Sequence, residues 1–234
     1  MNFKTAHILA ISMIISAIIL GSFFYAARME KETVRVVGYA TNDFEADIIK
    51  WTFNISVNVG LNELENGYNI IHEKLIKFEK IWKELHIETS DFNVNPVTVN
   101  NQFGEYGKIT GYNISQRIFL ISTNLVEIEK LAVNPASFVE KGITFEFSNI
   151  EYFSSKLPEI KQQLLAKATQ DARRRAEEII GVTSSKIKKM KSARAGVFQI
   201  TEPYSTDVAG YGIYQTSTRN KTIKVTVTAE FVIE

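Results

Sequence analysis

The chain of 234 residues contains no cysteine, so disulfide bonds, thiolate nucleophiles and cysteine-based metal sites are excluded. Histidine is scarce, with three residues, and no HExxH, GxSxG or Walker motif occurs. Two of them, His72 and His86, lie on one predicted helix about 21 Å apart along its axis, so they cannot bind one metal ion. These absences argue against a hydrolase or redox enzyme and predict a protein without catalytic residues, metal or cofactor.

The chain also lacks an excess of either positive or negative charge. Lys and Arg number 27 against 26 Asp and Glu, which leaves a net charge of +1 and predicts no nucleic-acid partner. Hydrophobic residues make up 45% of the chain and charged residues 23%, an ordinary globular composition. The chain therefore has enough apolar material for one large core or two small ones.

One long hydrophobic run is present, from Ile8 to Ala27. Its roughly 20 uncharged residues would span about 30 Å as a helix, the thickness of the hydrocarbon layer. Tyr25 lies near its outer end, as interfacial aromatic residues do. The run predicts a single membrane span, within an N-terminal anchor or uncleaved signal of residues 1–29.

The alternative for the same run is a cleaved signal peptide. Cleavage requires small residues at −3 and −1, and cleavage after Ala27 would place Tyr25 at −3. Both alternatives export residues 30–234. The predicted location is the inner (cytoplasmic) membrane, with one span and the bulk of the chain in the periplasm or outside; after cleavage, it is the free periplasm.

The exported part alternates between strand and helix periods. Apolar residues recur at every second position in strands and at every third or fourth in helices. Thr89, Ser90 and Asp91 end the first long helix. Pro96 interrupts the following strand and indicates an edge or a bulge. The first half contains a strand at 33–40, a strand at 44–59, a helix at 62–86, a strand at 92–100, a loop at 101–108 and a strand at 109–122.

The second half repeats this order after a short helix at 125–132, for which Asn124 or Thr123 is the expected cap. A long helix at 157–181 has an alanine stripe at its middle, Ala168, Ala172 and Ala176, which would let another backbone approach closely. The second half contains a strand at 143–150, that helix, a strand at 186–200, a polar loop at 202–220 and a strand at 222–233.

These patterns predict an α+β fold of two strand-helix-strand-strand units, about 33–122 and 123–234. Each unit is expected to be an antiparallel sheet covered by one long helix, preceded by the N-terminal membrane helix. One continuous sheet with both helices on the same face is the alternative. The spacing at 62–86 also fits a coiled coil, although the flanking strands favour packing on a sheet.

Four motifs in this order resemble the SIMPL-domain family of bacterial envelope proteins. The resemblance covers about 33–233. Its strands carry V-x-V-x-G-x-A at Val34–Ala40 and G-Y at Gly111-Tyr112. The remaining motifs are H-I-x-x-x-D-F at His86–Phe92, where glycine is usual at the first position and Pro96 follows, and A-x-x-D-A-R-x-x-A at Ala168–Ala176 with Gly181.

The resemblance implies a periplasmic or envelope-attached protein. Some members of the family assemble into large rings, and some are associated with resistance to oxidative stress. It implies no catalytic residue for this chain.

Two surfaces are candidate interfaces. Lys186 and Lys188 share one face of a lysine-rich strand, which is typical of a guarded sheet edge but also fits an acidic partner or anionic lipid. Tyr204, Tyr211 and Tyr214 lie in the long polar loop, where tyrosine can anchor an interface or simply occupy a mobile loop.

We therefore expect a non-enzymatic, membrane-anchored envelope protein that self-associates as a homo-oligomer, with a link to oxidative or envelope stress. The sequence does not identify a protein partner other than a second copy of the chain. The alternative is a binder of a small molecule or peptide through the long tyrosine-rich loops, which predicts a deep apolar pocket bordered by Tyr211 or Tyr106.

Overall fold

The structure is a computed structural model that describes residues 3–28, 32–87 and 91–234. It is a mixed α+β fold with two sheets that are mainly antiparallel. The chain divides into two compact units, one of residues 1–39, 168–196 and 226–234 and the other of residues 40–167 and 197–225. Both units thus combine segments far apart in the sequence.

The first helix, α1 (Phe3–Arg28), covers the hydrophobic run. Among the described residues, no helix meets the length and hydropathy that identify a membrane-crossing segment. The side chains described in α1 are His7 and those of 9–25. Most of the large apolar ones are exposed at consecutive as well as alternate positions: Leu9, Ile11, Met13, Ile14, Ile15, Ile18, Ile19, Leu20, Phe23 and Phe24.

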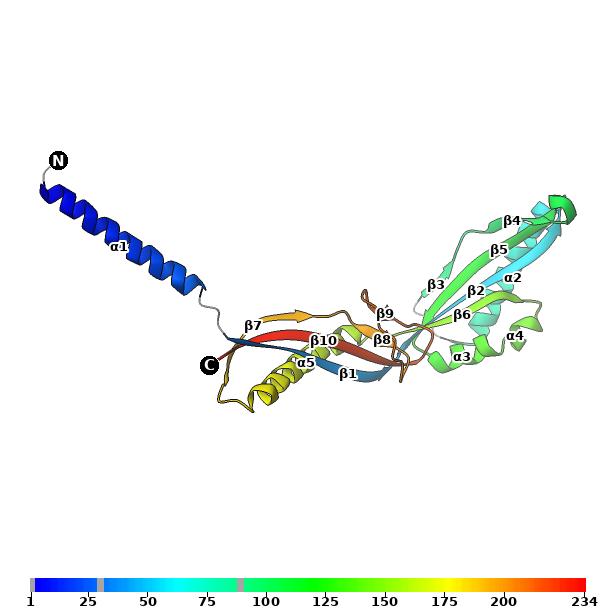
Figure 1. The fold of residues 1–234 in the computed structure, drawn as a ribbon. Helices are drawn as coiled ribbons and strands as arrows, with labels where there is room; N and C mark the ends of the chain where they lie inside the picture. Colours follow the sequence, from blue (N-terminus) through cyan, green and yellow to red (C-terminus); the bar gives the residue numbers. More distant parts are fainter. Residues whose placement is uncertain (1–2, 29–31, 88–90) are drawn as a thin grey trace. The chain divides into compact units, whose positions relative to one another are not determined.

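One sheet, the β2 sheet, has the strand order β3-β5-β2-β6, and β4 also pairs with β5 (Figure 1). The helix α2 (Leu64–Glu84) covers one face of it, together with the shorter helices α3 (Leu125–Val133) and α4 (Ala136–Val139). Its strands are β2 (Ile48–Gly60), β3 (Asp91–Val94), β4 (Thr98–Phe103), β5 (Ile109–Ser122) and β6 (Phe145–Phe153).

Aromatic side chains fill the core under α2. Trp51 and Phe53 of β2 are fully buried, as their alternation with polar residues predicts. Phe78 and Trp82 of α2 stack with ring centroids 5.8 Å apart, and the centroid of Phe53 lies 4.9 Å from that of Phe78. Sequence patterns thus identified this core correctly, and α2 packs on a sheet within the chain.

Local signals also placed several helix ends. Asn124 caps α3, because its side chain accepts a hydrogen bond from the N–H of Glu127, as expected. Two residues after α2, His86 has a φ of +51°, the left-handed conformation that glycine adopts at low cost. This explains why glycine is usual there in the motif. The predicted helix break at Thr89 and Ser90 lies outside the described residues.

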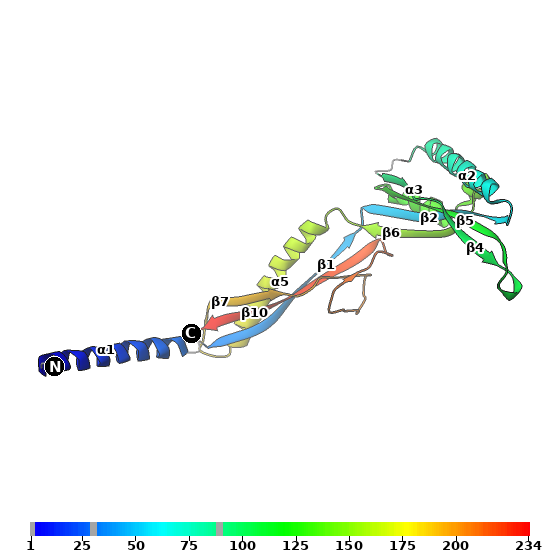
Figure 2. The ribbon, with the colours of Figure 1, turned by 90° about the horizontal axis from the view of Figure 1, so that it is seen from above.

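The other sheet, the β10 sheet, has the order β1-β10-β8-β9, and β7 also pairs with β10. The long helix α5 (Leu157–Ile180) lies along β1, β7 and β10 in both views (Figures 1 and 2). The strands are β1 (Thr33–Glu45), β7 (Ile187–Ala195), β8 (Gln199–Thr201), β9 (Ile213–Tyr214) and β10 (Asn220–Ile233), and a 3₁₀ turn, η1 (Glu105–Gly107), lies in the β4–β5 loop.

Two strands, β6 and β1, belong to different sheets from those that the two predicted units imply. β6, expected beside α5, pairs with β2, and Ile150 lies opposite Trp51. β1, from the first half of the chain, pairs with β10 instead. The chain passes between the sheets at Ala46 and Asp47, whose N–H groups donate to the carbonyls of Arg219 and Phe153. Period-2 patterns reveal which face of a strand is buried but not its partner, so this exchange was not predictable.

The strand predicted at 186–200 is divided into β7 and β8. Gly196 lies between them, and its N–H donates to the carbonyl of Thr226. A Cβ at Gly196 would lie 2.6 Å from Oγ1 of Thr226, so a larger residue would require the Thr226 side chain to move. β7 thus ends before this glycine, although the chain is still hydrogen-bonded to β10 there.

α5 and β1 touch through their backbones. A Cβ at Gly38 would lie 2.3 Å from the Ala172 nitrogen and 2.4 Å from the Ala168 oxygen. Ala172 and Ala176 are fully buried beside Val36. The small residues on both sides thus allow a helix-to-strand distance that any larger side chain would prevent, as the alanine stripe predicted.

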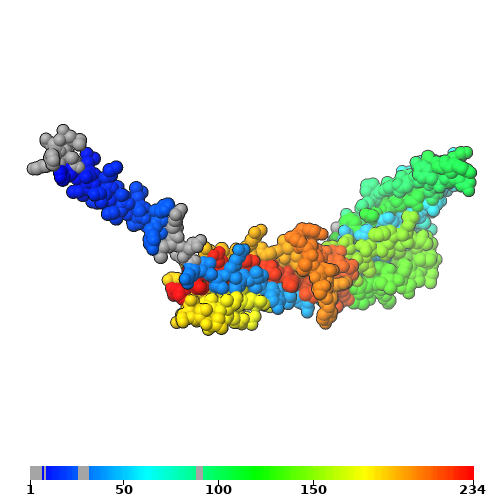
Figure 3. All heavy atoms as spheres, in the orientation of Figure 1, coloured from blue at the N-terminus to red at the C-terminus, as the bar shows by residue number. Residues whose placement is uncertain are grey.

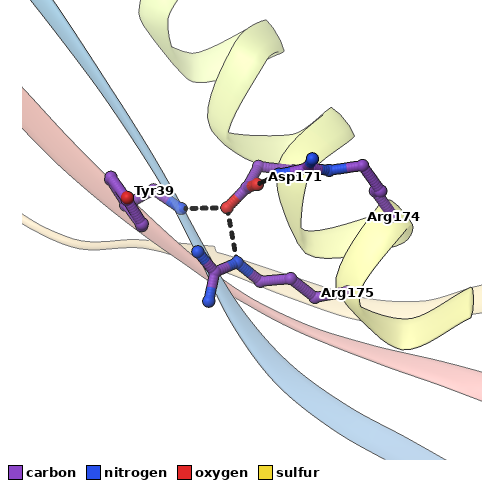
Figure 4. A network of polar contacts seen from close by, with 4 residues as sticks. All are labelled: Tyr39, Asp171, Arg174 and Arg175. Carbon is purple, nitrogen blue, oxygen red and sulfur yellow. Dashed lines mark hydrogen bonds and ion pairs between the residues drawn. The ribbon is translucent and has the colours of Figure 1, made fainter. Parts of the chain in front are cut away.

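A carboxylate joins the same two elements (Figure 4). Asp171 accepts a hydrogen bond from the backbone N–H of Tyr39 at 3.0 Å and from Arg174 and Arg175 at 2.6 and 2.7 Å. Because β1 is at the edge of its sheet, this N–H points away from β10 and Asp171 supplies its partner. The Tyr39 N–H first, and then the two arginines, lower the pKa of Asp171 to about 2, against the opposing effect of burial.

The close approach at Gly38 predicts that Gly38→Ala is destabilising. The added methyl group must displace the α5 backbone, so we expect a loss of about 2–3 kcal/mol in the free energy of unfolding. Chemical denaturation measures it. Gly210→Ala is the matched control, because nothing lies within 4 Å of a Cβ there. Equal stability of the two variants would contradict the packing of α5 on β1.

The Asp171 network predicts a dependence of stability on pH. Its pKa in the folded protein lies below the unfolded value, so the stabilisation is fully present above about pH 4 and is lost as the pH falls through about 2. Asp171→Asn should cost about 2 kcal/mol at pH 7, and this difference from wild type should shrink between pH 4 and 2. Urea denaturation at several pH values tests this, with Asp207→Asn as the control. A difference that stays constant with pH would refute the role of the carboxylate.

Candidate functional site

The two candidate lysines lie at the edge of the β10 sheet. Lys186 exchanges two backbone hydrogen bonds with Glu234, at 2.7 and 3.0 Å. The Nζ of Lys188 lies 2.5 Å from a carboxylate oxygen of the same Glu234. β7, which follows Lys186, pairs with β10 on one side. Charged side chains along such an edge discourage pairing with another chain.

The three candidate tyrosines differ in exposure. Tyr204 and Tyr211 are 99% and 91% exposed, whereas Tyr214 stacks on Phe153 with ring centroids 6.2 Å apart. Burial raises the pKa of Tyr214. The tyrosines belong to the unit of residues 40–167 and 197–225, whereas Lys186 and Lys188 belong to the other unit. Tyr204 and Tyr211 are thus free for an interface, and Tyr214 serves mainly to hold the loop.

The loop between β8 and β9 is held in place by specific hydrogen bonds. The side chain of Gln199 donates to the carbonyl of Ala209 at 2.8 Å and accepts from its N–H at 3.3 Å. Gly212 has a φ of +90°, and its N–H donates to the same Ala209 carbonyl. β8 and β9 then pair in parallel. The loop is therefore an ordered wall rather than a loose connection.

A cavity of about 620 Å³ lies between this loop and the strands beneath it. In Figure 3 the loop, in orange, forms a raised surface beside the red β10. The volume is within the range of small-molecule sites. Its lining residues come from β1, β8, β10 and the loop: Thr41, Asp43, Phe44, Gln199, Thr201, Pro203, Tyr204, Ser205, Thr206, Asp207, Val208, Asn220, Lys221, Thr222 and Lys224.

The cavity wall is polar and carries both charges. Hydroxyl groups come from Thr41, Thr201 and Thr222, and the last donates to Asp43 at 2.6 Å. Carboxylates and ammonium groups both line it. This set suits reversible binding of a polar molecule through hydrogen bonds.

Lys221 is the most deeply buried charged residue of the lining, with 1% of its surface exposed. Its Nζ donates to the backbone carbonyl of Gln215, which ties the end of the loop to β10. Burial lowers the pKa of Lys221. Lys221 was missed because the predicted strand begins at 222, although its position is in phase with the buried Ile223 and Val225 of β10.

A second polar cluster lies near the start of α3. The guanidinium of Arg219 contacts Glu45 at 2.6 Å and Glu129 at 3.4 Å. Burial, and then a hydrogen bond with Glu129, raise the pKa of the Tyr152 hydroxyl to about 12. The cluster joins β1, α3, β6 and the end of the loop. Its groups are committed to each other, so it is a structural network.

The polar cavity was not found by sequence reasoning, which selected the loop tyrosines. Of these only Tyr204 borders it. The cavity therefore differs from the expected apolar pocket, because its wall is polar and neither Tyr211 nor Tyr106 lines it. Thr41 of β1 and Thr222 of β10 each follow a buried residue, Ala40 and Lys221, whereas Thr201 of β8 is itself buried. Over 3–28, 32–87 and 91–234, no group of three or more His, Asp and Glu could hold a metal ion.

Comparison with known proteins finds one family. Residues 34–232 match the family model SIMPL, whose description is a protein of unknown function (DUF541). Among curated proteins, none matches the chain.

Proposed function

The chain belongs to the SIMPL family, and from this premise we propose a non-enzymatic, membrane-anchored envelope protein that self-associates and has a role in oxidative or envelope stress. The observation that carries the proposal is α1, a helix of 26 residues that includes the uncharged run Ile8–Ala27. The bulk of the chain then lies on the periplasmic or outer side of the inner membrane.

The exposure of α1 supports the anchor. Ile15, Ile18 and Leu20 are 51%, 65% and 69% exposed, and no polar face interrupts them. A helix that is apolar on every side is buried in a core or in a bilayer. The run Ile8–Ala27 also extends beyond the side chains described in α1. A bilayer would therefore cover a surface that the rest of the chain leaves open.

Self-association is supported by exposed aromatic residues on ordered loops. Tyr204 and Tyr211 are almost fully exposed, and Tyr204 has a φ of +64°, an uncommon conformation for a residue other than glycine. Tyrosines of this kind bury large areas at interfaces with a small loss of side-chain entropy. A second copy of the chain is the partner that this proposal names.

The polar cavity favours a second candidate function, the binding of a small molecule or peptide. Its volume of about 620 Å³ and its ordered loop resemble a preformed site. Side chains of both charges, Asp43 and Lys224 among them, suit a zwitterionic ligand. Thermal denaturation with a panel of amino acids and dipeptides tests this; a melting temperature unchanged by every compound would argue against it.

The anchor predicts that the full chain stays with membranes after alkaline extraction. Ile15→Lys with Ile18→Lys should release it, because each charge at the centre of a span costs about 3 kcal/mol. Ile15→Leu with Ile18→Leu is the control and should remain membrane-bound. Extraction of the wild-type chain together with soluble proteins would show that α1 is not an anchor.

Self-association predicts a mass above that of one chain when the protein is measured in detergent by light scattering. Tyr204→Ser with Tyr211→Ser should lower that mass by weakening contacts between copies. Tyr106→Ser is the control, since Tyr106 is 97% exposed but lies in a different loop. A single-chain mass for the wild type at every concentration would rule out a homo-oligomer.

A further inference from the structure

One end of the β10 sheet is placed close to α1 by the chain itself. The N–H of Ile233 donates to the carbonyl of Glu32 at 3.0 Å, so Glu32 lies beside the end of β10. Only four residue steps separate Glu32 from Arg28, the last residue of α1. Since a step covers at most about 3.6 Å, this end of the sheet lies within about 15 Å of the end of α1.

The beginning of β7 and the end of α5 lie at the same end of the sheet. Ile187 is paired with Ile233, and Lys186 exchanges two hydrogen bonds with Glu234. α5 ends at Ile180, and a short loop leads from there to β7. The sheet therefore brings the α5–β7 loop, residues 181–186, near the point where the chain leaves α1.

Apolar side chains are exposed at this place. Val182 in the loop is 90% exposed and Ile179 in the last turn of α5 is 55% exposed. Ile180 between them is 7% exposed and faces the core. Ile179 and Val182 are thus directed outward, while Ile180 packs the end of the helix on the core. The two exposed side chains are available to enter an apolar or interfacial medium.

Lysine side chains near these residues can contact an anionic surface. Among the described side chains, no ion pair holds Lys186 or Lys189, while Lys188 is paired with Glu234. Acidic residues also lie here, Glu32 at the end of the sheet and Glu178 in the last turn of α5. Lys186 and Lys189 are therefore the groups available to lipid phosphates, and each lysine near an anionic membrane surface adds to the attraction.

We infer that the α5–β7 loop, through Val182 and Lys186, and the flanking Ile179 and Lys189 dock on the headgroup layer of the membrane that holds α1. The inference rests on the proposed anchor. The apolar side chains enter the interface and the lysines contact lipid phosphates. The partner is the anionic lipid surface, and this contact would hold the β10 sheet at a defined orientation to the membrane.

The absence of cysteine makes a site-specific test simple. Val182→Cys, Ser16→Cys and Tyr106→Cys each provide one site for a fluorophore that responds to its environment. The labelled full chains are reconstituted in vesicles of phosphatidylcholine with phosphatidylglycerol. Lipids then carry quenchers either at the headgroup or in the acyl chains. Ser16 reports on α1, and the exposed Tyr106 of the other unit is the matched control.

The expected result is strong quenching of Val182 by headgroup quenchers, several-fold above that of Tyr106, with Ser16 quenched by acyl-chain quenchers. If Ser16 is quenched and Val182 resembles Tyr106, the docking is refuted while the anchor stands. If Ser16 is not quenched, the anchor itself fails. A change at Val182 that needs no lipid and rises with protein concentration would assign this surface to a second copy and overturn the inference.

The lysines are tested in the Val182→Cys chain. Lys186→Glu with Lys189→Glu should reduce headgroup quenching several-fold, as should vesicles of phosphatidylcholine alone. Lys77→Glu with Lys80→Glu on α2 makes the same change of charge elsewhere and should leave the quenching unchanged. Equal quenching in both lipids and in both variants would refute an anionic partner.

Discussion

The contact between α5 and β1 is the constraint on which the β10 sheet depends. At Gly38 the two backbones lie too close for any side chain, and Asp171 satisfies the N–H of Tyr39 on the outer side of β1. The carboxylate and its two arginines therefore close an edge that would otherwise expose unpaired backbone. Because β1 directly follows the segment after α1, this contact also connects the N-terminal helix to the folded body.

The chain crosses from the β10 sheet to the β2 sheet at Ala46 and Asp47, so the consecutive strands β1 and β2 belong to different sheets. β1 pairs with β10, more than 170 residues away in the chain, whereas β2 lies between β5 and β6. The β2 sheet is made from one continuous stretch, residues 48–153, whereas the β10 sheet combines β1 with strands from the C-terminal part of the chain. The ordered loop at 202–212 uses this arrangement, because its polar cavity is lined from β1, β8 and β10 together.

The polar features of the chain are engaged in structure or in reversible contacts. Arg219 and Glu129 join elements, Lys221 holds the end of the loop, and Asp171 fastens a helix. The exposed tyrosines, the cavity of hydroxyl groups and the α5–β7 loop suit association with a copy, a small polar molecule and a lipid surface. The proposed role as an anchored, non-enzymatic protein is consistent with this distribution.

The sequence by itself determined the elements and their buried faces, because helix and strand periods depend on neighbouring residues. β5 begins and ends where its alternation predicts, Asn124 caps α3, and the Ala168–Ala176 stripe indicated a close helix contact. Only the tertiary structure decided that β6 joins β2 and that β1 joins β10. It also decided that Lys221 is buried and that three threonines line one cavity. Strand pairing and loop closure depend on contacts between residues that are distant in the sequence. The periodicity of apolar residues along a strand or helix does not indicate which surfaces pack together.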